Sequence, residues 1–123
     1  MVYGCGIDIE EIERFNKHYF ENGRLSDLIY DLFTSKEIEN FSVFGKEAFL
    51  KGFCFKEAFY KAVNNADIDF KDVEIIFSDD QNFEILKSKK IEQLFLTNKI
   101  VKLEAKVEIN KQYALVKLVL VKD

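Results

Sequence analysis

The sequence contains no proline and no tryptophan, only one histidine and only two cysteines. Without proline, the chain holds no polyproline-type linker or ligand segment. Two cysteines, Cys5 and Cys54, are too few for a disulfide scaffold or a four-ligand zinc site, and we expect both to be free, small, buried side chains. A single histidine, His18, cannot build a histidine-rich metal site. Any metal ion would therefore be held mainly by carboxylates, which favours a hard cation such as magnesium.

Long apolar runs and an excess of positive charge are also absent. No run approaches the roughly 18 apolar residues of a membrane span, and the first residues do not resemble a secretory leader. The net charge of -4 and the pI of about 5.1 argue against a nucleic acid or an anionic membrane as the main partner. We therefore expect a cytoplasmic protein that acts without nucleic acid and without a membrane.

The residues that are present are typical of one small globular domain. The chain has 123 residues, of which 48% are hydrophobic and 13 are phenylalanine, enough for one core. Helical spacing dominates the first half and strand-like alternation the second. We expect a single domain over residues 1–123 of the α+β class, in which N-terminal helices and one long central helix pack on an antiparallel sheet.

Local patterns predict the individual elements. The predicted elements are a strand at 1–9, helices at 10–20, from 26, at 34–44 and at 46–63, and strands at 73–77, 83–86, 100–109 and 113–121. Thr34 and Glu37 predict a capping box, and Gly45 predicts the end of that helix. In the short helix that begins near Ser26, Leu28 is expected to be buried. Residues 89–96 fit either a short helix or an irregular turn.

The helix predicted at 46–63 carries the strongest apolar pattern. Four phenylalanines recur along it and are expected to pack in the core: Phe49, Phe53, Phe55 and Phe59. Gly52 lies within this pattern and is expected to weaken the helix by about 1 kcal/mol relative to alanine.

Two features can carry chemistry. Glu57 and Lys61 lie one helical turn apart on one face of the central helix, and Asp8 ends an apolar, glycine-containing strand. Taken alone, Glu57 and Lys61 fit an ordinary surface ion pair, and Asp8 fits a hydrated acid at a strand end. The combination of the two features in one small chain favours a functional site.

The sequence resembles the holo-acyl-carrier-protein synthase family, the small class of 4′-phosphopantetheinyl transferases. The resemblance begins with Gly6-Ile7-Asp8-Ile9 and Glu13-Arg14-Phe15, and continues through Phe33-Thr34-Ser35-Lys36-Glu37 and Phe49-Leu50. It reaches the family's aromatic-x-x-Lys-Glu-Ala-x-x-Lys signature at residues 53–61. The match covers roughly the first half of the chain. The family moves phosphopantetheine from coenzyme A to a serine of an acyl carrier protein, releases adenosine 3′,5′-bisphosphate and works as a homotrimer.

The resemblance implies roles for particular residues. Asp8 and Glu57 would hold Mg²⁺, and Lys61 would steady a phosphate or protonate the leaving group, which gives three catalytic residues. Whether Lys61 or a metal-bound water is the base toward the serine stays open. Lys56 and Phe53 would contact coenzyme A, although Lys56 also fits a solvated lysine and Phe53 a core residue.

The resemblance also implies a surface for the acidic carrier protein, which Arg14, Lys17 and Arg24 would provide on the first helices. Electrostatic matching of this kind mainly speeds encounter. The second half departs from the family. Residues 80–84 replace its Gly-Lys-Pro loop, and residues 107–111 replace its Ser-x-Ser/Thr-His stretch.

Three hypotheses follow. The first is a magnesium-dependent transferase that uses coenzyme A in fatty acid biosynthesis. The second is a related protein that binds coenzyme A or a carrier protein without transfer, which the replaced nucleotide loop would permit. The third is a structural domain in which Glu57 and Lys61 form a surface ion pair.

Overall fold

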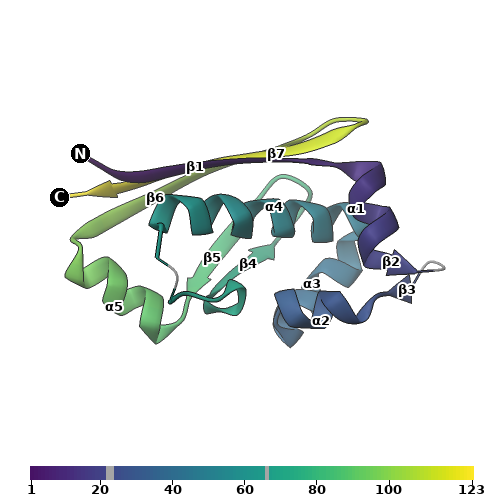
Figure 1. The fold of residues 1–123 in the computed structure, drawn as a ribbon, viewed down its shortest axis with the longest axis horizontal. Helices are drawn as coiled ribbons and strands as arrows, with labels where there is room; N and C mark the ends of the chain where they lie inside the picture. Colours follow the sequence, from purple (N-terminus) through teal and green to yellow (C-terminus); the bar gives the residue numbers. More distant parts are fainter. Residues whose placement is uncertain (22–23, 66) are drawn as a thin grey trace.

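A long helix, α4 (Lys46–Val63), lies between a three-stranded antiparallel sheet and a layer of shorter elements (Figure 1). The computed structural model describes residues 1–21, 24–65 and 67–123. The sheet has the order β1-β7-β6 and is built from β1 (Val2–Glu11), β7 (Tyr113–Lys122) and β6 (Ile100–Ile109). The predicted α+β class, with a central helix on an antiparallel sheet, is confirmed.

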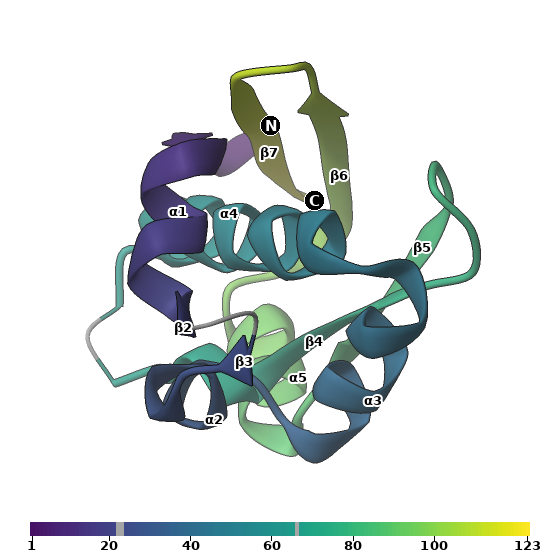
Figure 2. The same ribbon diagram turned by 90° about the vertical axis from the view of Figure 1, so that its right-hand side faces the viewer.

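The remaining elements lie around the other side and the ends of α4. In Figure 2, strands β6 and β7 of the sheet lie above α4, whereas α2, α3 and β4 lie below it. These remaining elements are α1 (Ile12–Tyr19), β2 (Phe20–Glu21), β3 (Arg24–Leu25), α2 (Asp27–Leu32), α3 (Ser35–Phe44), a 3-10 turn (Phe70–Asp72), β4 (Val73–Phe77), β5 (Phe83–Lys87) and α5 (Lys89–Thr97).

The ends of α3 and α4 are set by local backbone chemistry. The Thr34 hydroxyl accepts a bond from the Glu37 N–H, and the Glu37 carboxylate accepts one from the Thr34 N–H, so the predicted capping box is confirmed. Gly45 separates the two helices at φ 95°, a conformation that favours glycine. Asn64 ends α4 in the left-handed region at φ 52°. The predicted bounds of α4 are therefore confirmed at both ends.

Phenylalanine forms much of the core, as predicted. Phe49, Phe55 and Phe59 are almost fully buried, and Phe53 is 9% exposed. Ring centroids in contact lie 5.2–6.4 Å apart where α3 and α4 meet β4, in mostly tilted or edge-to-face pairs. Such geometry adds about 0.5–1.5 kcal/mol per pair beyond burial.

Two predicted burials are wrong. Leu28 is 43% exposed, because α2 turns its neighbour Ile29 into the core instead. Cys5 is exposed on the outer face of the sheet, whereas Cys54 is buried as predicted and both thiols are free.

Glycines in β1 allow that strand to touch the backbone of α4. A Cβ atom on Gly6 would overlap the carbonyl group of Ala58, and a Cβ atom on Gly4 would overlap that of Ala62. Gly52 likewise allows a close contact within the core, because a Cβ atom there would lie 2.7 Å from the Phe41 ring. The expected weakness of α4 at Gly52 is therefore accompanied by closer packing of α3 against α4.

The β4–β5 turn forms without the proline that the Gly-Lys-Pro loop of the holo-acyl-carrier-protein synthase family contains. The Asp79 carboxylate accepts bonds from the backbone N–H groups of Gln81 and Asn82 and from the Asn82 side chain. The same hydrogen bonds hold the pKa of Asp79 below its usual value. Lys51 of α4 donates a bond to the Asp80 carbonyl at 3.1 Å, which ties the turn to the central helix.

None of the helices in the described ranges 1–21, 24–65 and 67–123 combines the length and the apolar character that spanning a membrane would require.

Candidate active site

Strand β1 and helix α4 bring the predicted acid and the predicted lysine together. Asp8 lies on the face of β1 that is turned toward α4, and its Oδ1 atom lies 3.1 Å from the Lys61 Nζ atom. Lys61 also donates a bond to the Ile7 carbonyl at 3.1 Å. The Asp8 side chain is only 8% exposed, whereas that of Lys61 is 51% exposed. The site thus joins a buried carboxylate to solvent through one ammonium group.

The second oxygen of Asp8 has no partner among the described residues. Oδ2 is buried and accepts no hydrogen bond within them. The Cys54 thiol donates a bond to the Asp8 backbone carbonyl at 3.1 Å, which fixes the strand opposite the helix but leaves this oxygen free. An unpaired buried carboxylate oxygen is costly, so it is typical of a position that awaits a ligand.

Glu57 completes the predicted trio. It is half-buried on α4, one turn before Lys61, and burial followed by the charge of Asp8 raises its pKa above the usual value. The hydrogen bond from Lys61 to Asp8 raises the pKa of Lys61 in turn. The structure therefore brings Asp8, Glu57 and Lys61 together, although the sequence placed Asp8 about fifty residues away from the other two.

Glu10 is a further acidic residue of the site that the sequence analysis missed. Burial, the neighbouring carboxyl group of Asp8 and the charge of Glu57 raise the pKa of Glu10 to about 8. The available signal was the strand period of two residues, which puts Asp8 and Glu10 on the same face of β1. When ionised, these carboxyl groups carry more negative charge than Lys61 can balance, so a bound cation would favour their ionised form.

The acidic groups do not by themselves form a complete metal cage. Within residues 1–21, 24–65 and 67–123, no three histidine, cysteine, aspartate or glutamate side chains converge as a ready set of metal ligands. Mg²⁺ commonly takes only one or two protein carboxylates and fills its other positions with water and phosphate oxygens. The buried free oxygen of Asp8 and the all-oxygen donor set fit such an ion.

A pocket of about 590 Å³ opens beside the acidic groups, between α1 and α4. Its lining residues include Glu10, Arg14, Lys17 and the ring of Phe53. Phe53 is therefore compatible with both expectations, a core residue and a coenzyme A contact, because it belongs to the core and also faces a pocket. Two of the predicted docking residues, Arg14 and Lys17, flank this pocket, while the third, Arg24, is exposed on β3.

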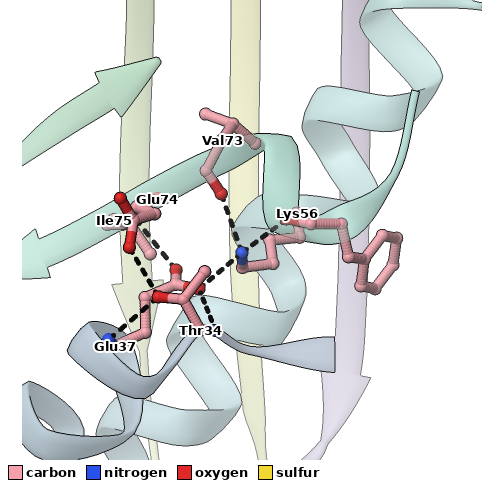
Figure 3. Close-up of polar contacts among 7 residues, drawn as sticks. Thr34, Glu37, Lys56, Val73, Glu74 and Ile75 are labelled. Carbon is pink, nitrogen blue, oxygen red and sulfur yellow. Dashed lines mark hydrogen bonds and ion pairs between the residues drawn. The ribbon is translucent and has the colours of Figure 1, made fainter. Parts of the chain in front are cut away.

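Lys56 lies elsewhere. Its side chain is 0% exposed, and its Nζ atom lies 2.7 Å from Glu37 Oε1. It also donates bonds to the carbonyl groups of Phe70 and Val73 (Figure 3). The expectation of a coenzyme A contact or of a solvated lysine does not agree with this burial, because all the contacts of the ammonium group are inside the protein.

Comparison with protein families gives a match over most of the chain. Residues 4–116 match the family model described as the 4′-phosphopantetheinyl transferase superfamily. The chain is 35% identical over 101 residues to a holo-[acyl-carrier-protein] synthase from Geobacter sp. (strain M21), covering 77% of this chain and 78% of that protein. It is 38% identical over 85 residues to a protein of the same name from Streptococcus thermophilus, covering 64% of this chain and 69% of that protein.

Solved structures share the fold. A holo-[acyl-carrier-protein] synthase from Neisseria meningitidis superposes with a TM-score of 0.81 at 23% identity, over 99% of this chain and 100% of that one. One from Helicobacter pylori, in complex with coenzyme A, gives 0.75 at 23% identity, over 95% and 99%. A small α+β domain with this match is a member of the 4′-phosphopantetheinyl transferase superfamily. Within it, the chain belongs to the holo-[acyl-carrier-protein] synthase family.

Proposed function

We propose that this protein transfers the 4′-phosphopantetheine group from coenzyme A to a serine of an acyl carrier protein. Family membership supports the reaction, and the observation that carries it here is the buried Asp8 oxygen beside Glu57 and Lys61, which has no partner among the described residues. The serine oxygen forms a bond to the β-phosphorus of coenzyme A as the pyrophosphate bond breaks. The serine loses its proton, and adenosine 3′,5′-bisphosphate leaves.

Asp8 and Glu57 are proposed as the protein ligands of Mg²⁺, with Glu10 beside them. The carboxylates supply oxygen donors at a position with surplus negative charge, and one Asp8 oxygen is free to bind. When bound, the ion would offset the charge that develops on the pyrophosphate oxygens.

Lys61 is proposed to hold a phosphate of coenzyme A. Its ammonium group is half exposed, and it is anchored at 3.1 Å by Asp8 and at the same distance by the Ile7 carbonyl. An ammonium group that donates two bonds inward keeps one N–H for a ligand on the solvent side. The raised pKa of Lys61 keeps this group protonated while it faces phosphate charge.

The pocket between α1 and α4 is proposed to receive the substrates. Phe53 would pack against coenzyme A, and Arg14 and Lys17 would face the acidic carrier protein, with Arg24 at the edge of the same region. Glutamates on α1 and β2 dilute this positive charge, so we expect docking to depend on the few arginine and lysine side chains named here and to weaken with salt.

Mass spectrometry of an apo acyl carrier protein tests the transfer. With coenzyme A and Mg²⁺, the carrier is expected to gain one phosphopantetheine, and a carrier whose acceptor serine is replaced by alanine is expected to gain none. A protein that binds coenzyme A but modifies no carrier would instead be the non-catalytic member of the fold. A protein whose melting temperature responds to neither Mg²⁺ nor coenzyme A would be a structural domain.

Assembly as a homotrimer is also proposed, and exposed apolar side chains on the outer face of β1 and at the first residues of β6 and β7 support it. Large apolar side chains are exposed there: Val2, Ile7, Ile9 and Val101, with Tyr113 at one end. Light scattering is expected to give three times the chain mass, and Ile9→Glu to give the mass of a single chain because a charge would be buried in the contact. Leu96→Glu, on α5, is the control. A wild-type protein that stays a single chain contradicts the trimer.

We also propose that residues 1–123 act as one domain in the cytoplasm. The core contains side chains from both halves of the chain, and the two free thiols suit a reducing compartment. Cell fractionation with a tagged chain tests the location, and recovery in a membrane or secreted fraction would contradict it.

A further inference from the structure

The ion pair of Lys56 and Glu37 is completely enclosed, which is rare for these residue types. Both side chains are 0% exposed, and the Nζ and Oε1 atoms lie 2.7 Å apart. Lys56 comes from α4, directly before the proposed metal ligand Glu57, whereas Glu37 comes from the first turn of α3. Burial alone lowers the pKa of Lys56 and raises that of Glu37, and each partner opposes the change in the other.

Every polar atom of this pair has a partner, as Figure 3 shows. Glu37 Oε1 also accepts from the Thr34 N–H, and Oε2 accepts from the Ile75 N–H at 3.0 Å. Lys56 donates at 2.6 Å and 2.7 Å to two carbonyl groups at the start of β4 and in the turn before it. The Thr34 hydroxyl donates to Glu74. The network therefore joins α3, α4 and β4 through hydrogen bonds whose directions are fixed.

The pair and the active site hold α4 from opposite sides. Cys54 and Ala58 face β1, because the Cys54 thiol bonds the Asp8 carbonyl and Ala58 lies against Gly6. Lys56 is two residues from each of them, which is about 200° around the helix axis. Strand β1 sets the distance of α4 on one side, and the ion pair on the other side resists rotation of the helix.

Rotation matters because Glu57 must face Asp8. A carboxyl group roughly 6 Å from the axis moves about 2 Å when a helix turns by about 20°. Apolar contacts of α4 tolerate such a change better than a charged bond does, because hydrophobic packing has no fixed direction.

We propose that the enclosed Lys56–Glu37 pair is a positioning device that sets the rotation of α4 and thereby holds Glu57 opposite Asp8. The inference rests on the proposed function, because Mg²⁺ is the ion that Glu57 is proposed to bind. It assigns Lys56 and Glu37 a role in the activity without contact with either substrate.

The test compares Lys56→Met with Phe59→Ala, a core variant of the same helix. Both are expected to lower the melting temperature by a comparable amount, Lys56→Met because Glu37 loses its charged partner and Phe59→Ala because a cavity opens in the core. Both are assayed at a low temperature at which circular dichroism shows them folded. Lys56→Met is expected to lower turnover at saturating substrate at least about 10-fold, whereas Phe59→Ala stays within about 3-fold of the wild type.

A second readout does not depend on transfer. The Mg²⁺ concentration that gives half of the rise in melting temperature is expected to increase at least about 10-fold in Lys56→Met and to be unchanged in Phe59→Ala. If Lys56→Met matches Phe59→Ala in both readouts, the pair only stabilises the fold and the proposal is wrong.

The double variant Glu37→Met/Lys56→Met covers the case in which the single variant does not fold. Replacing both members of a buried pair by apolar side chains often costs little stability, so this variant is expected to fold and still to show both losses. Full turnover in the double variant, or failure of both variants to fold, would overturn the positioning role. If the wild type transfers nothing, the proposed function fails, while the Mg²⁺ titration still decides the role of the pair. If the wild type binds no Mg²⁺ either, both proposals fail.

Discussion

Replacing Asp8 by asparagine is expected to lower the rate of phosphopantetheine transfer by about 1000-fold, which corresponds to roughly 4 kcal/mol of transition-state stabilisation. The change keeps the size of the side chain but removes the charge that would bind Mg²⁺ and that pairs with Lys61 at 3.1 Å. Steady-state assays of carrier modification measure the loss.

The same change is expected to leave the free energy of unfolding equal to or above that of the wild type in metal-free buffer. Burial is the main cause of the raised pKa values of Glu10 and Glu57, and the charge of Asp8 adds to it, so removing that charge relieves part of the repulsion. Glu11→Gln, an exposed change on the same strand, is the control and is expected to keep full activity. An Asp8→Asn protein within 10-fold of wild-type activity would rule out Asp8 as a metal ligand.

Replacing Gly6 by alanine is expected to lower the free energy of unfolding by at least about 3 kcal/mol. The new Cβ atom would overlap the Ala58 carbonyl, and neither the strand nor the helix backbone can yield without breaking other contacts. Because small domains are stable by only about 5–15 kcal/mol in total, this single methyl group removes a large share. Urea unfolding monitored by circular dichroism measures the change.

Transfer activity is expected to fall with Gly6→Ala even where the protein is still folded, because moving β1 away from α4 separates Asp8 from Glu57. Cys5→Ala is the matched control, since this neighbouring side chain is exposed on the outer face of the same strand. If Gly6→Ala is as stable as Cys5→Ala, the close approach of β1 and α4 is not required.

The sequence was sufficient for the elements whose ends are set locally. Gly45 and Asn64 lie at the two ends of α4, and each adopts a positive φ that its own residue type favours. Residues 89–96 stayed ambiguous, and they are the helix α5 because the Ser88 hydroxyl caps it. That cap was a readable signal.

The position of the candidate site was partly predictable. Asp8, Glu57 and Lys61 came from two short patterns, and the structure brings them together. The burial of Lys56 was not predictable, because its partner Glu37 lies on another helix and lysine is ordinarily exposed. Long-range pairing of this kind leaves no periodic signal in either segment.

The pairing of β1 with β7 has a consequence for how the enzyme comes to exist in a cell. Asp8 lies opposite Val116 in the sheet, so the strand that carries the key carboxylate is completed by a segment far along the chain. A nascent chain that still lacks β7 can form α3 and α4 but cannot seat Asp8 against them. Contacts between such distant segments are slow to form. A chain in which β7 has not yet paired with β1 would therefore carry the signature helix while the proposed metal site is still incomplete.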